Sequence, residues 1–482
     1  MSLSVPMREA ERANGHLAAR VFDGPDCPAD PVALGRLRVG LAGADLAAPP
    51  VVLPDFHHKG DKEMPSSIAV ATRETIRATL TSASLNCGMA LVALDMEPPG
   101  ARAVNEFYRR VRERYPYPPT YRRDLTPTEV VDCAVEGSHF AADRFGVDPA
   151  ELDRVEEGGR LDIGRFGGRE RARYELPWSV VQLSRIRFGT IGPSNHFIEL
   201  QQVAEVLDPE AAELLGLRAG QVTLQFHGGG GSLPGELGLL FGRRKRYPAA
   251  VRVQMAAQKP LYHFGRARSL EELRLRRALY FSRDCPPVER QSAEGDRLML
   301  AAAMAMNYGF AFRLSTYASL RQILLSSFGP VGARLVVDSP HNTIYEEYVD
   351  GQPALVHRHN SCRVYPATAQ PGHPVFGRLG RPLLLPGTSR TSSYVCVPDW
   401  EAAHGLNSTC HGAGATISGL VRRGLSGPDP RGRATLRFSY SSEAPEEVPH
   451  LDDRGIDDVL HILTRNRIAR PVARLRPFAV LN

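Results

Sequence analysis

Residues 221–231 read Gln-Val-Thr-Leu-Gln-Phe-His-Gly-Gly-Gly-Gly, an apolar run that ends in His227 and passes into four glycines. Short apolar runs bounded by glycine are typical of buried strands. A turn at the end of a strand is also a place where a rigid support can present a functional side chain. We therefore interpret this segment as a strand that carries a histidine to its end.

Similar strand-like runs occur at 50–54, 90–96, 334–338, 382–387, 392–398 and 434–440. Helical patterning is clearest at 269–283 and returns at 294–327 as one long or broken helix. Strands and helices are interspersed without a regular β-α-β alternation, which favours a mixed α/β fold over a doubly wound sheet. We expect one large domain over 1–482, with sheets flanked by helices around a central cleft and a polar helical insertion at about 98–173.

Composition narrows the class of protein. The chain has 482 residues, of which 43% are hydrophobic and 23% charged, and these values exclude wholesale disorder. No apolar run approaches the roughly 18 residues of a membrane span. Residues 1–12 turn polar without an apolar core, so we expect no secretory signal, no membrane partner and a cytoplasmic location.

Charge and cysteine content leave several functions open. The net charge of +6 permits nucleic acid as a partner without requiring it. Among the 59 basic residues only four are lysines, at positions 59, 62, 245 and 259, so a lysine nucleophile is quick to test. The seven cysteines include no Cys-x-x-Cys pair, and we expect no disulfide framework.

One cysteine and three histidines lie where strand-like runs meet turns: Cys87, His196, His227 and His341. A thiolate and three imidazoles can complete the ligand set of a divalent cation, and these donors alone favour zinc over magnesium or calcium. Each residue taken alone also has a plain reading, as a hydrogen-bonded histidine or a buried cysteine. The metal site is therefore a hypothesis about the four residues together.

Glycine-rich and hydroxyl-rich turns could cradle phosphate through backbone N–H groups. One such turn spans 386–393 and another spans 410–414, although a polar turn between strands is the plainer reading of the first. Neither matches the P-loop or dinucleotide-binding signature. The basic cluster at 243–246 is either a solvated loop or a contact for nucleic-acid phosphates.

Several of these segments, in this order, resemble the RtcB-type RNA ligases (tRNA-splicing ligases) over about 50–482. The two most specific are Gly-Thr-Ile-Gly-Pro-Ser-Asn-His-Phe-Ile-Glu at 189–199 and His-Gly-Ala-Gly at 411–414. The other matching stretches are 54–57, 85–89, 338–342, 357–358, 386–389, 393–394 and 408–410. The resemblance implies a single large domain of that kind, with the metal site in the central cleft.

The resemblance also implies an activity. Such enzymes join an RNA 2′,3′-cyclic phosphate or 3′-phosphate end to a 5′-hydroxyl end in RNA splicing and repair, using GTP, one or two Mn²⁺ ions and a histidine–GMP intermediate. By motif position the nucleophile is His411 and the metal ligands are Cys87, His196, His227 and His341. An archease-type activator is a further candidate partner. The nucleotide would be held by Asn195, His196, Phe197, Ile198, Glu199, His341, Asn342, Pro386, Gly387, Thr388, Ser389, Ser393, His411, Gly412, Ala413 and Gly414.

The chain departs from the family pattern at positions close to the chemistry. Ser84 stands where the family has an Asp that bridges two metal ions, with Asp55 or His57 as possible substitutes, and Asn482 replaces a C-terminal Lys that contacts guanine. Family arginines are missing at three further positions: in the run after His227, at Ala415 and at Gly419. His359 and Phe312 are further changes.

These departures support an alternative, a ligation-deficient paralogue that binds metal and nucleotide or RNA. A third reading is a zinc hydrolase with Glu199 as the candidate base.

Overall fold

The computed structural model describes residues 18–60, 62, 64–81, 83–117, 123–186, 188–192, 195–229, 231–242, 246–282 and 285–482. Among these residues the larger sheet has nine strands, and seven of them form one continuous row. In spatial order the row is β13 (Leu383–Leu385), β14 (Ser393–Pro398), β18 (Ala469–Leu481), β6 (Phe197–Val206), β7 (Val222–Gly229), β5 (Cys87–Leu94) and β9 (Ala333–Pro340). The other two strands are β16 (Ala434–Phe438), which pairs with β18, and β17 (Glu446–Pro449), which pairs with β16.

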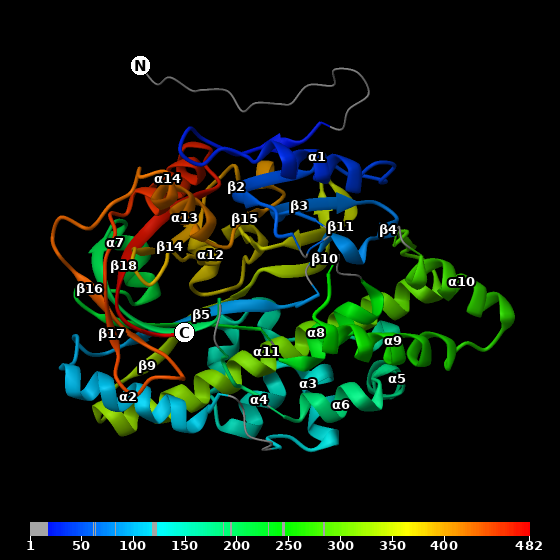
Figure 1. The fold of residues 1–482 in the computed structure, drawn as a ribbon, viewed down its shortest axis with the longest axis horizontal. Coiled ribbons are helices and arrows are strands. Elements are labelled where there is room, and N and C mark those ends of the chain that lie inside the picture. Colours follow the sequence, from blue (N-terminus) through cyan, green and yellow to red (C-terminus); the bar gives the residue numbers. More distant parts are fainter. Residues whose placement is uncertain are drawn as a thin grey trace.

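A smaller sheet lies above the larger one in the view of Figure 1. Its order is β1 (Arg20–Val21), β2 (Val51–His57), β3 (Ser66–Thr72), β11 (Gln352–His359) and β10 (Asn342–Val349). Two short ribbons complete the described strands: β12 (Ser361–Arg363) with β15 (Ser408–Cys410), and β4 (Thr75–Ile76) with β8 (Val288–Glu289). The chain passes from the larger sheet to the smaller one between β9 and β10, so His341 lies at the junction of the two sheets.

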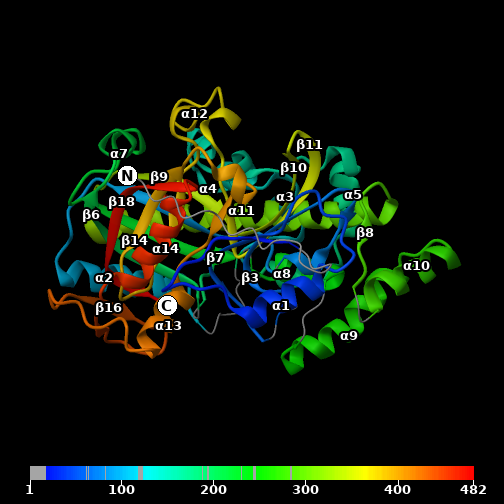
Figure 2. The same cartoon turned by 90° about the horizontal axis from the view of Figure 1, so that it is seen from above.

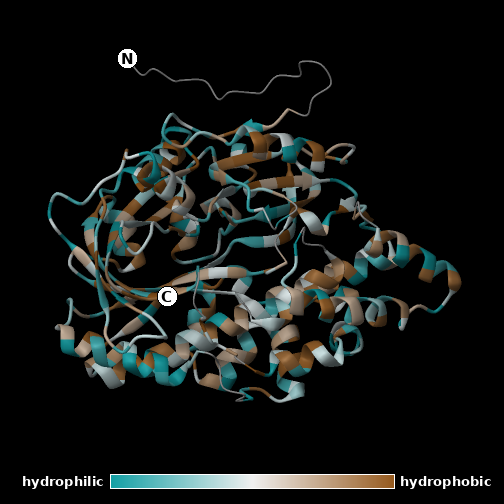
Figure 3. Cartoon of the chain, viewed as in Figure 1, coloured by the Kyte–Doolittle hydropathy of each residue, from teal (hydrophilic) through white to brown (hydrophobic). Residues whose placement is uncertain are grey.

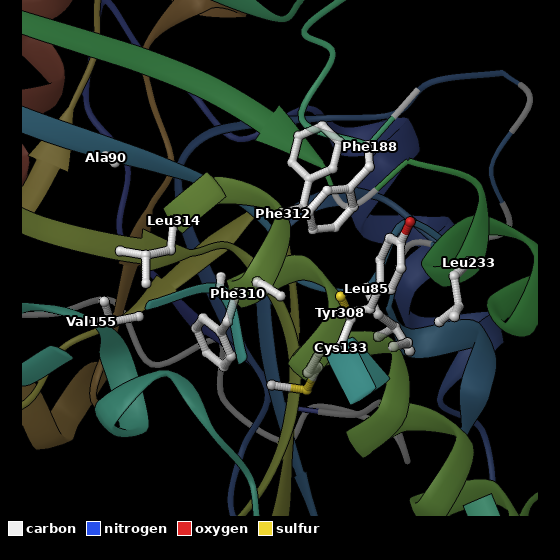
Figure 4. Packing of buried hydrophobic residues seen from close by; sticks show 14 of the residues in the cluster. Leu85, Ala90, Cys133, Val155, Phe188, Leu233, Tyr308, Phe310, Phe312 and Leu314 are labelled. Carbon is white, nitrogen blue, oxygen red and sulfur yellow. The ribbon is translucent and has the colours of Figure 1, made fainter. Parts of the chain in front are cut away.

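The central helix α11 (Ala293–Phe328) is continuous over 36 residues. Ser292 caps its first turn, because the Ser292 hydroxyl accepts the N–H of Gly295, and Gly329 ends it with a φ of +83°. Buried apolar residues lie on every side of this helix, which is typical of a helix inside a domain. Figure 4 shows Tyr308, Phe310 and Phe312 of this helix within the largest hydrophobic cluster.

Helices cover the larger sheet on the side where α11 lies (Figure 1). Residues 98–173 supply α2 (Ala101–Arg114), α3 (Pro127–Glu136), α4 (Ser138–Phe145) and most of α5 (Gly168–Glu175), and all four pack against α11. Figure 3 shows much hydrophilic colour along α2, whose inner face still buries Phe107 and Tyr108. That this region is an insertion into the family domain stays a prediction.

The remaining helices lie around these layers. The hairpin of α9 (Ala249–Phe264) and α10 (Leu270–Phe281) projects from the body in Figure 2. None of the helices in the described ranges is both long and apolar enough to span a membrane. The others are α1 (Pro31–Gly40), α6 (Trp178–Ser184), α7 (Pro209–Leu215), α8 (Ser232–Phe241), α12 (Phe376–Leu379), α13 (Gly414–Arg422) and α14 (Arg454–Arg465).

The expected mixed α/β single domain is confirmed. Each of the seven strand-like runs coincides with a strand, and the run at 294–327 forms one unbroken helix, α11.

Candidate metal centre and adjoining pocket

Four neighbouring strands of the larger sheet bring the candidate ligands together. Cys87 is the first residue of β5, which lies between β7 and β9. In the antiparallel register Met89 pairs with His227 of β7 and Gly88 pairs with Pro340 of β9, directly before His341. Phe197 of β6 also pairs with His227, which places His196 at the same end of the sheet. Residues from four distant parts of the sequence therefore converge on one point.

The distances around Cys87 are short enough for a shared metal ion. The Sγ atom of Cys87 lies 3.3 Å from Nε2 of His227 and 3.5 Å from Nε2 of His196. The ligating atoms of Cys87, His227 and His341 all lie within 4.8 Å of one another, and these three residues are buried. Metal–sulfur and metal–nitrogen bonds of about 2.0–2.3 Å fit this spacing.

The hydrogen bonds of the histidines leave nitrogen atoms available for a metal. His227 Nδ1 lies 2.7 Å from the carbonyl oxygen of Asn195 and donates its proton there, so Nε2 presents a lone pair to Cys87. His341 Nδ1 is buried and has no hydrogen-bond partner among the described residues. A buried nitrogen without a partner is rare in a folded protein, and a bound ligand would satisfy this one. The residues present therefore fit a bound divalent cation.

Burial sets the protonation states of this cluster. It lowers the pKa of both His227 and His341 well below the usual value, and it also lowers the pKa of His196. Burial raises the pKa of the Cys87 thiol to about 12, against the opposing effect of the nearby Arg313 guanidinium. The imidazoles are therefore neutral near pH 7, and metal binding displaces the thiol proton.

A buried ion pair between Arg313 and Asp338 lies next to the turn that carries Cys87. Arg313 of α11 forms a two-pronged contact with Asp338 of β9, with Nη2–Oδ1 at 2.7 Å and Nε–Oδ2 at 2.8 Å. The same guanidinium donates to the backbone and side-chain oxygens of Asn86. Because Asn86 directly precedes Cys87, this network fixes the start of β5.

The candidate nucleophile lies beside the ligands. His411 follows β15, and its ring centroid is 4.7 Å from that of His341 and 6.4 Å from that of His227. Its Nδ1 atom has no hydrogen-bond partner in the described part of the chain. Burial, together with the positive charges of Lys59 and His57, lowers the pKa of His411 to about 3. A neutral imidazole of this kind is a competent nucleophile.

His411 also lines a cavity of about 460 Å³ that adjoins the metal centre. Of the residues expected to hold a nucleotide, the cavity wall contains Asn195, Phe197, Glu199, Pro386, Gly387, Thr388, Ser389, Ser393, His411, Gly412, Ala413 and Gly414. Four others, His196, Ile198, His341 and Asn342, lie outside this wall. Successive residues of a strand point to opposite faces, so Phe197 and Glu199 face the cavity while Ile198 is fully buried in the hydrophobic core.

Hydrogen bonds connect the cavity residues of β6 and β14. Gln201 Nε2 donates to Glu199 Oε1 at 2.6 Å and to Ser393 Oγ at 3.3 Å, and Ser393 Oγ accepts the N–H of Gly387. Burial raises the pKa of Glu199 to about 8, so its carboxyl group is mostly protonated near pH 7. The strand period of two could have identified Gln201, which shares a strand face with Glu199.

Sequence reasoning assigned no role to several further residues of the cavity wall: Lys59, Met89, Val480 and, as a binding residue, Asn482. Asp55 and His57 also line the cavity. The buried Asp55 carboxylate accepts the backbone N–H of Thr416 at 2.6 Å and the Thr416 hydroxyl at 2.7 Å, at the start of α13. These two bonds commit one Asp55 oxygen to α13.

Comparison with known proteins identifies the family of the chain. The family model described as "tRNA-splicing ligase RtcB" matches residues 44–482. A tRNA-splicing ligase RtcB from Pyrococcus horikoshii is 30% identical over 73% of this chain, which spans only 39% of that protein's length. A tRNA-splicing ligase RtcB from Thermococcus kodakarensis is 26% identical, with 89% of this chain and 86% of that protein covered.

A bacterial relative extends the comparison. The RNA-splicing ligase RtcB from Mycobacterium tuberculosis is 28% identical, with 71% of this chain and 73% of that protein covered. The match to the family model includes every strand that contributes a candidate ligand. On this match, which covers nearly the whole sequence, the chain belongs to the RtcB family.

Proposed function

We propose that this protein is an RNA ligase that joins a 2′,3′-cyclic phosphate or 3′-phosphate RNA end to a 5′-hydroxyl end, using GTP and a divalent metal. The observation that carries the proposal is the position of His411. It is a neutral imidazole that lies 4.7 Å from His341, ring to ring, and it forms part of the wall of the adjoining cavity. A nucleophile between a metal-capable cluster and a nucleotide-sized cavity suits nucleotidyl transfer.

The residues suggest the following chemistry. The ring lone pair of His411 attacks the α-phosphorus of GTP; the N–P bond forms, and the P–O bond to the β-phosphate breaks with its electron pair on pyrophosphate. A 2′,3′-cyclic end is first opened by water to a 3′-phosphate. An oxygen of the RNA 3′-phosphate then attacks the same phosphorus, and the N–P bond breaks with its electron pair on His411. The 5′-hydroxyl finally attacks the activated 3′-phosphate and loses its proton to solvent, and GMP leaves. His411 needs no strong base, because it is already deprotonated near pH 7.

The metal would be held by Cys87, His227 and His341. Nε2 of His196 lies 3.5 Å from the Sγ atom of Cys87. A bound divalent cation offsets negative charge that develops on phosphate oxygens. We propose Mn²⁺ because of the family, whereas thiolate and imidazole donors by themselves favour zinc. Metal analysis of the purified protein, followed by activity with each metal added to the stripped protein, distinguishes the two.

A second candidate function is a paralogue that binds metal and nucleotide or RNA but does not ligate. Ser84 favours it, because a neutral side chain stands three residues before Cys87, where a second cation would need a carboxylate. Guanine preference is part of the primary proposal, although Asn482, rather than a lysine, lines the cavity.

The deciding experiment is formation of the covalent adduct. Protein is incubated with α-labelled GTP and Mn²⁺ and separated on a denaturing gel, beside His411→Ala and the control His404→Ala, an exposed histidine. We expect a labelled band in the parent and the control and none in His411→Ala. Ligation of RNA with cyclic-phosphate and 5′-hydroxyl ends, with and without an archease-type activator, then tests the complete reaction. A labelled protein that never joins RNA supports the paralogue, and the absence of any band contradicts nucleotidyl transfer.

A further inference from the structure

The cavity beside His411 has one permanently charged cation among its described lining residues, Lys59. The other ionisable groups of this wall are the carboxyl groups of Asp55 and Glu199 and three histidines. Lys59 follows directly after β2, two residues beyond His57, and its side chain is exposed. No described acidic residue forms an ion pair with it. Among the described lining residues, Lys59 is therefore the one lysine or arginine that a polyanion in this cavity would meet.

The positive charge of Lys59 affects the pKa of several groups of the site. It contributes to the lowered pKa of His411, after burial, and to the lowered pKa of His359, after burial and Lys62. It also opposes the burial that raises the pKa of Cys87. The cavity wall itself, which Lys59 shares with His57 and His411, places this exposed lysine on the side of the molecule where the site lies.

Composition makes the position of this lysine unusual. The chain uses arginine almost everywhere, with only four lysines among 59 basic residues, yet both Lys59 and Lys62 lie on the connection between β2 and β3. A flexible stem that ends in a compact ammonium group can follow a phosphate as its charge redistributes, whereas an arginine fork demands a fixed planar partner. A general preference for arginine does not by itself account for a lysine beside this cavity.

We propose that Lys59 is a phosphate-binding residue, and that its ammonium group binds the terminal phosphates of a nucleoside triphosphate whose α-phosphate faces His411. This inference rests on the proposed function. When the P–O bond to the β-phosphate breaks, negative charge builds on the departing pyrophosphate. An ammonium group placed there stabilises the departing group more than the bound triphosphate.

The test compares nucleotides of different phosphate number. Binding of GTP and GMP to the full-length, manganese-loaded protein is measured by calorimetry for the parent, Lys59→Ala, Lys59→Arg and the control Arg252→Ala, which removes an exposed cation of α9. We expect Lys59→Ala to weaken GTP binding roughly 10- to 100-fold, the range for a charge-assisted hydrogen bond, and GMP binding less than about twofold. Lys59→Arg should recover part of the loss, and Arg252→Ala should match the parent.

The outcomes separate this inference from the proposed function. If the parent binds GTP and forms the adduct while Lys59→Ala binds GTP equally well, Lys59 is not a phosphate ligand and the ligase proposal stands. If the binding of GTP and the binding of GMP weaken equally, the substitution has disturbed the cavity and the phosphate assignment is overturned. If only binding of RNA with a 3′-phosphate weakens, the phosphate comes from RNA rather than the nucleotide. If the parent binds no nucleotide, the proposed function itself fails.

Lysine labelling gives a second readout that does not depend on a substitution. Pyridoxal phosphate with borohydride labels accessible lysines, and mass spectrometry has only four sites to distinguish in this chain. We expect GTP to protect Lys59 and GMP to leave it reactive, while Lys259 is labelled equally in both cases. Equal labelling of Lys59 with and without GTP would contradict the proposal.

Discussion

The backbone N–H of Cys87 donates to the carbonyl oxygen of Ser84 at 3.3 Å, which closes a turn directly before β5. Asn86 occupies the third position of this turn with a φ of +57°, a conformation that asparagine tolerates better than most residues. The turn therefore holds residue 84 close to the backbone of Cys87. The Ser84 carbonyl also accepts from the side chain of Asn342, which joins the turn to β10.

Ser84→Asp is expected to raise the number of manganese ions bound per chain. A carboxylate in this turn, three residues before Cys87, would supply a hard oxygen ligand and a negative charge, and both favour a second cation. The measurement is manganese stoichiometry by calorimetry and elemental analysis. The Ser84→Asn side chain is nearly as large as that of Ser84→Asp but carries no charge, so this variant should bind the same number of manganese ions as the parent. An unchanged stoichiometry in Ser84→Asp would contradict the role assigned to this position.

Glu199→Gln is expected to change how stability depends on pH. Burial raises the pKa of Glu199 to about 8 in the folded protein from its usual 4.5, so folding favours the protonated form. Its contribution to stability is complete below about pH 4.5 and is lost as the pH rises through about 8. The loss is at most a few kcal/mol, by the rule of about 1.4 kcal/mol for each pH unit.

Urea unfolding of the metal-free, nucleotide-free protein between pH 5 and pH 9 measures this effect. We expect Glu199→Gln to be less sensitive to alkaline pH than the parent. Glu205→Gln changes an exposed residue of the same strand and should leave the profile as it is. Parallel profiles for the parent and Glu199→Gln would show that the carboxyl group is already ionised when the protein folds.

The strands that the sequence revealed are continuous apolar runs, such as β5, β7 and β9, because burial on both faces leaves a local signal. The long strand β18 carried no such signal. It contains Pro471 and Pro477, and the register shifts near each of them, at Val395/Cys396 opposite Pro471 and at Pro477/Ala479. Strand order is also invisible locally, since β5 pairs with β7 and β9 across more than a hundred residues.

In the candidate site, too, some residues carry a local sequence signal and others do not. Histidines at strand ends could be recognised from their flanking turns, and the family resemblance gave each a role. Lys59 and Asn482 received no positive role in that reasoning, because only the folded chain brings the segment after β2 and the residue after β18 to one cavity. Local sequence carries no trace of contacts of this kind.

Gly88→Ala is expected to disrupt the metal centre, because β5 and β9 approach each other closely at this residue. A Cβ atom at Gly88 would lie 2.8 Å from the Cα of Pro340 and from the carbonyl oxygen of Ser339, and 2.9 Å from the Cζ of Arg313. Two of these atoms belong to the backbone, so the strands must separate, at a cost of about 1–3 kcal/mol in the free energy of unfolding.

The measurements for Gly88→Ala are the free energy of unfolding and the manganese affinity. Separation of the strands moves His341 away from Cys87, so we expect both to fall. Gly235→Ala is the matched control, since no atom lies within 4 Å of its added methyl group and it sits within α8. That variant should gain about 0.5–1 kcal/mol from helix propensity. A Gly88→Ala protein with parental metal affinity would rule out the close approach.

Asp338→Asn is expected to destabilise the protein more than the loss of a surface ion pair. Both Arg313 and Asp338 are buried, and the substitution leaves the guanidinium charge without its counter-ion. Breaking one side of a buried pair costs about 3–5 kcal/mol, whereas an exposed pair contributes less than about 1 kcal/mol. Glu210→Gln, which breaks the exposed pair with Arg378, is therefore the control.

The free energy of unfolding, measured with denaturant for both variants, tests this difference. We expect manganese binding to weaken in Asp338→Asn as well, because Arg313 also donates to Asn86 and holds the turn that presents Cys87. A loss of stability without any loss of manganese affinity would show that the ion pair supports the core but not the metal centre. Equal stability of the two variants would contradict the buried pair altogether.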